Sequence, residues 1–145
     1  MVSFSELLSR DMADKMNMIP GTVLLGEMEG VDHLKFFVIV GVGLDMVCVC
    51  AVVINSSINP FIMKRPHLLA RQVQLQCKRY DFLSHDSYVN CANPLKGKAE
   101  NFKGYRRVGQ LTDEDLVLVR EEIVSSGMLS ANELKSYQLL AEASR

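Results

Sequence analysis

The longest apolar stretch of the chain runs from Phe36 to Ile54 and contains one charged residue, Asp45. It is nearly as long as a membrane-spanning helix, which needs about 20 apolar residues. Nine of its residues are Val or Ile, which favour strands, and its centre reads GVGLD, where two glycines and an aspartate suit a hairpin turn. A hairpin explains Asp45, whereas a membrane helix must bury it. We therefore predict two strands joined by a turn, and a membrane span is the alternative.

Three further segments have the pattern of strands. PGTVLLGEMEG opens with a Pro-Gly turn and ends at Glu29 and Gly30, RQVQLQCKRY alternates as a half-buried strand does, and HDSYVNC forms a third, short strand. In HDSYVNC the three residue types of a catalytic triad are adjacent, but neighbouring side chains on a strand point to opposite faces, which argues against a triad. We expect the polar, glycine-containing segment KGKAENFKGYRRVGQ to be a connection.

The pattern then changes to a helical period. Thr112 can cap a helix from Asp113 through about Ser126, with acidic residues in its first turn and Gly127 just past its end. A second helix follows, because Ser130 and the glutamate three residues later form a capping box. The segment SFSELLSRDM near the N-terminus predicts a further short helix. These elements predict a mainly β (α+β) fold: a small antiparallel sheet or barrel followed by two helices.

Size and composition are those of one ordinary domain. The chain has 145 residues, of which 48% are hydrophobic and 23% charged, so we expect a single domain over residues 1–145. The barrel is expected at about 20–95 and the C-terminal helical segment at about 112–143. Its N-terminus is charged rather than apolar, and its four cysteines have no CxxC spacing. We expect free thiols, a cytoplasmic protein, and neither a metal nor a cofactor, with Cys48 and Cys50 filling the core.

The order of elements resembles that of the MazF/PemK family of toxin endoribonucleases. The resemblance covers about residues 20–126 and is carried by PGTVLLGEM, HLKFFVIVG, MVCVCAVVINSS, YDFLSHDSYVNCANPL and VGQLTDEDLVLVREEI. It implies a small SH3-like antiparallel barrel with a C-terminal helix. It also implies a homodimer that cuts single-stranded RNA without a metal and is neutralised by an antitoxin peptide.

The resemblance places the candidate catalytic residues at two strand ends. Where the family has an Arg-Pro pair opening the second strand, this chain has His33, Leu34 and Lys35, and its third strand ends at Asn55, Ser56 and Ser57. His33 can act as a general acid or base, and Lys35 can hold a phosphate as a point charge, without the bidentate fork of arginine. The alternative interpretation is that His33 and Lys35 are a solvated start of the strand, and that Ser56 and Ser57 are turn residues.

Positive charge is concentrated in the middle of the chain. Residues 60–109 contain ten Lys or Arg and three acidic residues, although the net charge of the whole chain is −1. Bases and aromatic side chains interleave there, a combination suited to single-stranded RNA. The alternative is a solvated basic surface, or one that pairs with the acidic helix 113–126. The candidate RNA-binding residues are Lys64, Arg65, Lys78, Arg79, Tyr80, Arg106 and Arg107.

Two function classes follow. The first is a toxin-type protein that acts on single-stranded RNA, through ribonuclease activity or through RNA binding, and is held in check by an antitoxin peptide. The second is a barrel that serves as a non-catalytic interaction module and has lost the enzyme. Loss of the Arg-Pro pair favours the second, and the basic middle of the chain favours the first.

Overall fold

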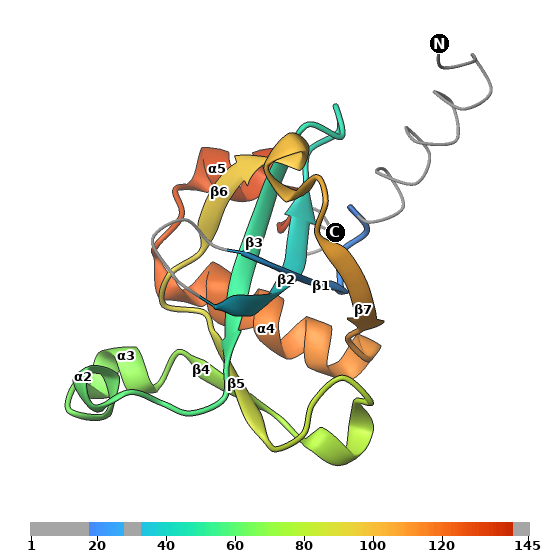
Figure 1. The fold of residues 1–145 in the computed structure, drawn as a ribbon. Coiled ribbons are helices and arrows are strands. Elements are labelled where there is room, and N and C mark those ends of the chain that lie inside the picture. The colour runs from blue at the N-terminus through green and yellow to red at the C-terminus, as the bar shows by residue number, and fades with distance from the viewer. Residues whose placement is uncertain (1–17, 28–32, 141–145) are drawn as a thin grey trace, which may run out of the picture.

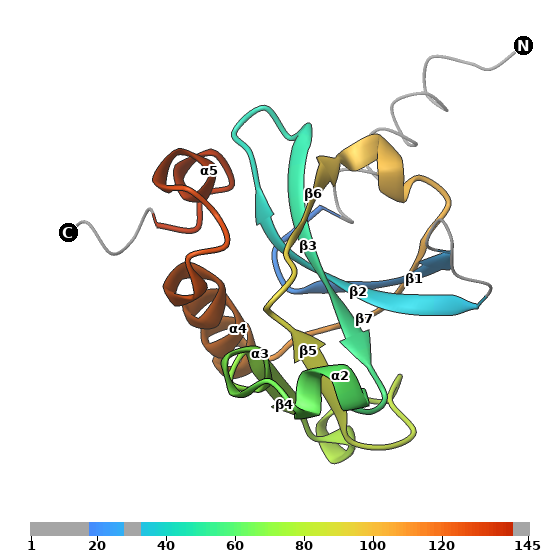
Figure 2. The same cartoon turned by 90° about the vertical axis from the view of Figure 1, so that its left-hand side faces the viewer.

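The computed structural model describes residues 18–27 and 33–140, and the predicted N-terminal helix lies outside them. Figure 1 shows the strands crossing in front of a long helix, and Figure 2 shows α4 and α5 together on one side of the sheet. The strands are β1 (Thr22–Glu27), β2 (Leu34–Val42), β3 (Cys48–Asn55), β4 (Gln72–Leu75), β5 (Ser87–Asn90), β6 (Leu95–Lys98) and β7 (Arg106–Gln110). The helices are α2 (Pro60–Met63), α3 (Pro66–Leu69), η1 (Cys77–Arg79), η2 (Ala99–Phe102), α4 (Asp113–Ser126) and α5 (Ala131–Ser136).

The hairpin prediction is confirmed. β2 and β3 pair antiparallel, and the turn between them is held by Asp45, whose Oδ1 accepts hydrogen bonds from the backbone N–H groups of Val47 (2.9 Å) and Cys48 (3.3 Å). The aspartate that interrupts the apolar stretch thus supplies the acceptor that closes the turn. None of the helices in the described residues is both long and apolar enough to cross a membrane.

The mainly β (α+β) fold is confirmed, but the sheet is open rather than a closed barrel. Its seven strands in the described part of the chain run in the order β4-β5-β3-β2-β1-β7, with β6 on β3, and these neighbours pair antiparallel. Within the described residues β4 and β7 end this order and do not pair with each other. On the side away from β2, the first half of β3 pairs with β6 and its last two residues pair with β5.

The segment from Lys96 to Gln110, predicted as a connection, instead contains two strands. β6 pairs with the first half of β3, and β7 pairs with β1 through a register that shifts between Val23 and Leu24. Both strands are half-buried at most. Backbone pairing with a neighbouring strand holds these two polar segments in the sheet, so the sheet extends to Gln110 and not to about 95.

The two C-terminal helices form as predicted, with one difference in length. Thr112 accepts a hydrogen bond from the N–H of Asp115 at 3.2 Å, and Gly127 ends α4 in the left-handed region. Ser130 and Glu133 make the reciprocal capping box of α5. α5 ends at Ser136 and residues 137–140 are not helical, so within the described residues this helix is shorter than predicted. Helices α4 and α5 cover one face of the sheet, where the buried residues include Val38, Val52, Val119, Ile123 and Leu134.

Two of the four cysteines lie in the core, Cys77 is half-buried against it, and Cys48 is exposed. Cys50 and Cys91 are buried, and burial raises the pKa of both thiols to about 12. Cys48 is exposed at the start of β3, so the prediction that it fills the core is wrong. It shares a strand face with Cys50, but the first position of β3 lies beside the exposed turn.

Candidate functional site

The four predicted catalytic residues lie at one end of the β2–β3 pair. Phe36 lies opposite Ile54, so the preceding residue Lys35 lies beside Asn55, and its Nζ donates a hydrogen bond to Asn55 Oδ1 at 3.0 Å. Ser56 and Ser57 follow at once and are exposed, and the exposed His33 comes two residues before Lys35. Because the strands are antiparallel, the start of β2 and the end of β3 lie at the same end of the strand pair. This end, with His33, Lys35, Asn55, Ser56 and Ser57, is called here the Lys35 edge.

An aromatic cluster adjoins this edge on the face of the sheet opposite α4. Lys35 of β2 lies opposite Gly26 of β1. A Cβ added to Gly26 would come within 2.4 Å of the Tyr105 ring. The hydroxyl of Tyr105 donates to the Glu27 carbonyl at 2.5 Å, which fixes the ring over the strand. Phe37 and Phe102 stand 5.4 and 5.3 Å from that ring, measured between ring centroids. Only a glycine allows the ring to approach the backbone so closely.

The Lys35 edge can bind an anion. A lysine ammonium has three donors, and one of them is used by Asn55. The amide oxygen is neutral, so it orients the ammonium without cancelling its charge. The hydroxyls of Ser56 and Ser57 supply further donors. None of these three side chains provides the planar, bidentate contact of a guanidinium. The edge therefore offers a positioned point charge beside hydroxyl groups.

The predicted RNA-binding residues lie at three separate places. Lys64 and Arg65 follow α2, Lys78 and Arg79 belong to η1, and Arg106 and Arg107 are exposed on β7. Figure 1 shows α2 and β7 on opposite sides of the molecule. On β7, Arg107 pairs with Leu24, which packs in the cluster beneath the aromatic rings, so Arg107 shares that face. Its neighbour Arg106 points to the other face.

The prediction that Tyr80 binds RNA is wrong, because its buried ring cannot stack on a base. Its side chain is only 5% exposed, and its hydroxyl donates to the buried carboxylate of Asp115 and accepts from the N–H of Thr112 at 3.1 Å. Burial, followed by the hydrogen bond to Asp115, raises the pKa of this hydroxyl. Arg79 lies 3.9 Å from the same carboxylate. Tyr80 and Arg79 therefore attach η1 to the start of α4. For these two residues the structure agrees with the alternative interpretation, in which the basic segment pairs with the acidic helix.

The remaining cation of η1 is presented by a fixed backbone. The N–H of Cys77 donates to Asp86 Oδ1 at 2.9 Å, and Lys78 is exposed. This bond and the neighbouring Lys78 and His85 lower the pKa of the Asp86 carboxyl, with the hydrogen bond as the larger cause. Asp86 thus acts as a structural acceptor that holds the start of η1.

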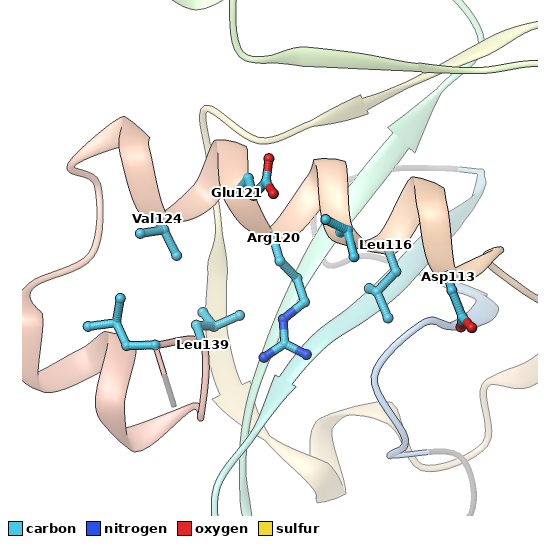
Figure 3. Close-up of a pocket in the computed structure, with 8 residues that line it drawn as sticks. Asp113, Leu116, Arg120, Glu121, Val124 and Leu139 are labelled. Carbon is cyan, nitrogen blue, oxygen red and sulfur yellow. The ribbon is translucent and has the colours of Figure 1, made fainter. Parts of the chain in front are cut away.

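A groove of about 520 Å³ lies on the helical side of the molecule, away from the Lys35 edge. Figure 3 shows its lining side chains, which come from α4 and from the segment after α5. Leu116, Val124 and Leu139 make it largely apolar, and Asp113 and Glu121 add two carboxylates beside the guanidinium of Arg120. The lining thus has more carboxylates than cations and lacks the surplus of positive charge that attracts phosphates.

Within the described residues, no three His, Cys, Asp or Glu side chains lie together as metal ligands would. No family model matches the chain, and no curated protein is similar enough to indicate a relative.

Sequence reasoning missed two neighbours at this edge. The first is Asn55, which accepts the hydrogen bond of Lys35, and the second is Tyr88 of β5, which lies opposite Asn55. The antiparallel register supplies the first partner, provided that the bulge between Ile39 and Gly41 is known. No local signal reveals the second, because β5 is brought to β3 by the fold.

Proposed function

We propose that this chain acts on single-stranded RNA as a MazF/PemK-like, metal-independent endoribonuclease. The observation that supports the proposal most is the hydrogen bond between Lys35 and Asn55, which holds a cation at the residue directly before Ser56 and Ser57. The aromatic face next to this edge, with Tyr105 and Phe102, suits unpaired bases, and Arg107 adds positive charge on the same face.

The proposed reaction is an attack of the RNA 2′-oxygen on the adjacent phosphorus. His33 removes the 2′-hydroxyl proton, and the bond from phosphorus to the 5′-oxygen breaks as the new bond forms. Lys35 and the hydroxyls of Ser56 and Ser57 stabilise the negative charge that develops on the phosphate oxygens. The leaving 5′-oxygen takes up a proton from water, and His33 later releases its proton to water, so the products carry a 2′,3′-cyclic phosphate and a 5′-hydroxyl.

The proposed partners follow from the same resemblance and from the open sheet. An antitoxin peptide would hold the enzyme inactive in the cytoplasm. A homodimer would cover strand edges, and in the described residues β4 and β7 are the terminal strands of the sheet. Unpaired strand edges favour association with another chain, and two-fold dimers are the commonest solution.

The test is incubation of the purified protein with a long single-stranded RNA in EDTA. The comparison variant is the double substitution Lys35→Ala, Ser57→Ala, and the matched control is Lys135→Ala, which removes an exposed lysine from α5 on the helical side. We expect cleavage by the unchanged protein and by the control, and a loss of at least about 100-fold in the double variant, the order of one positioned charge or donor in such a site.

The same experiment separates the two function classes. Binding is measured in parallel with a 2′-O-methyl RNA, which cannot supply the attacking hydroxyl. Binding without cleavage of ordinary RNA would support the non-catalytic interaction module and contradict the nuclease. Cleavage that survives in the double variant would remove the Lys35 edge from the mechanism.

A further inference from the structure

Helix α2 presents one aromatic side chain to solvent on a short, well-anchored turn. Asn59 caps the helix by accepting the N–H of Ile62 at 2.9 Å, and Pro60 fixes its first position. Ile62 is 8% exposed and attaches the turn to the protein, whereas Phe61 is 58% exposed. A buried anchor and a fixed cap hold Phe61 outward on a backbone that has little freedom.

Arg65 lies over one face of the Phe61 ring. Its Cζ is 3.5 Å from the ring centroid, and its Nη1 donates to the Phe61 carbonyl at 2.8 Å. The hydrogen bond holds the guanidinium in place, and the cation is attracted to the electron-rich face of the ring. The other part of the ring is left exposed, so the pair forms a flat aromatic and cationic platform.

The surroundings of this platform favour an anionic partner. Residues 56–80 contain no Asp or Glu but include Lys64 and Arg65. Among the described residues, no carboxylate is within ion-pair distance of either side chain. The platform also follows the Lys35 edge directly, because only three residues separate Ser57 from Phe61. A bound RNA strand that runs from Ser57 along the chain would therefore reach the platform of Phe61 and Arg65.

We infer that Phe61 and Arg65 form a stacking site for one unpaired RNA base, beside the edge at which cleavage is proposed. The inference rests on the proposed function, since it names where the strand is held. The base stacks on the exposed part of the Phe61 ring, while Arg65 and Lys64 contact the flanking phosphates. Every base has an aromatic face, so this site binds RNA without selecting its sequence.

The test compares two exposed apolar residues of the same short helix. Phe61→Ala removes the platform, and Met63→Ala is the matched control because Met63 is 56% exposed. Binding of a fluorescein-labelled, unstructured 2′-O-methyl RNA of about 12 nucleotides is measured by fluorescence anisotropy. We expect Phe61→Ala to weaken binding by at least about fivefold, the cost of losing one base stack, and Met63→Ala to leave it within about twofold.

A second readout reports stacking itself. The chain contains no tryptophan, so Phe61→Trp introduces a single indole, and Met63→Trp is its control. The same RNA is expected to quench the fluorescence of the indole at position 61 and to leave the one at position 63 nearly unchanged. Phe61→Trp is also expected to retain the affinity of the unchanged protein.

The outcomes distinguish this inference from the proposed function. If the unchanged protein does not bind the RNA, the proposed function and this inference fail together. If it binds and Phe61→Ala binds equally well, the stacking site alone is wrong, and the exposed ring is then free for contact with a protein. Weaker binding by Phe61→Ala together with quenching only at position 61 supports the inference.

Discussion

Replacing Tyr80 by Phe removes one buried hydroxyl and keeps the ring. The ring is 5% exposed and packs 5.5 Å from Phe82, between centroids, so its apolar contacts remain. The hydroxyl donates to Asp115, which is 6% exposed, and accepts from the N–H of Thr112. The variant therefore leaves a buried carboxylate with one fewer donor, near Arg79 at 3.9 Å.

The magnitude follows from the type of hydrogen bond that is lost. A hydrogen bond to a charged group contributes about 1.5–3 kcal/mol, and a buried acceptor left without its donor retains its desolvation cost. We expect Tyr80→Phe to lower the free energy of unfolding by about 2 kcal/mol. This corresponds to a fall of about 1 M in the urea midpoint and of about 4–8 °C in Tm for a domain of this size.

Urea denaturation followed by circular dichroism measures this difference. Tyr88→Phe is the control, because Tyr88 is half-exposed and that variant is expected to stay within about 0.5 kcal/mol of the unchanged protein. Asp115→Asn, alone and combined with Tyr80→Phe, completes a double-mutant cycle and should give a coupling of about 1 kcal/mol or more. A loss below about 0.5 kcal/mol, or two additive substitutions, would refute the reasoning.

The same variant has a defined dependence on pH. Burial and the bond to Asp115 raise the pKa of Tyr80 in the folded protein above its usual 10.0. A raised folded-state pKa means that this stabilisation is fully present below pH 10 and is lost as the pH rises through the folded-state pKa. The stability difference between the unchanged protein and Tyr80→Phe should therefore shrink above pH 10, and a difference that grows there would contradict this sign.

Three further predictions concern single positions. Gly26→Ala should lower Tm by several degrees, because its Cβ would meet the Tyr105 ring, and a thermal melt measures this. Asp45→Ala should cost about 1 kcal/mol in urea denaturation, because the turn loses the acceptor of two backbone N–H groups. At pH 8, Cys48 should react with a thiol reagent well before Cys50, whose buried thiol has a pKa of about 12. Mass spectrometry of the labelled protein identifies the modified residue.

The elements with strong local signals could be predicted from the sequence. Thr112, Gly127 and Ser130 bound the two helices because capping depends on neighbouring residues alone. The β2–β3 hairpin was predictable because its turn residues interrupt an apolar stretch. β6 and β7 were not, since their polar sequences form strands through backbone pairing with β3 and β1.

The candidate site depends on a β-bulge in the β2–β3 pair, which no local sequence pattern indicates. Near the turn Gly41 pairs with Cys50, and beyond the bulge Ile39 pairs with Ala51. An uninterrupted register would place Lys35 opposite Ser56, whereas the bulge places it beside Asn55. The prediction that Tyr80 binds RNA was wrong for a related reason, because the partner of its hydroxyl, Asp115, lies far along the chain.

The most direct test of the proposed nuclease is the chemistry of the RNA ends after cleavage in EDTA. Attack by the 2′-oxygen predicts fragments with a 2′,3′-cyclic phosphate and a 5′-hydroxyl, formed by the unchanged protein and lost in Lys35→Ala. Mass spectrometry of the fragments distinguishes these ends from others. Fragments with a 3′-hydroxyl and a 5′-phosphate, or no fragments at all, would contradict the account.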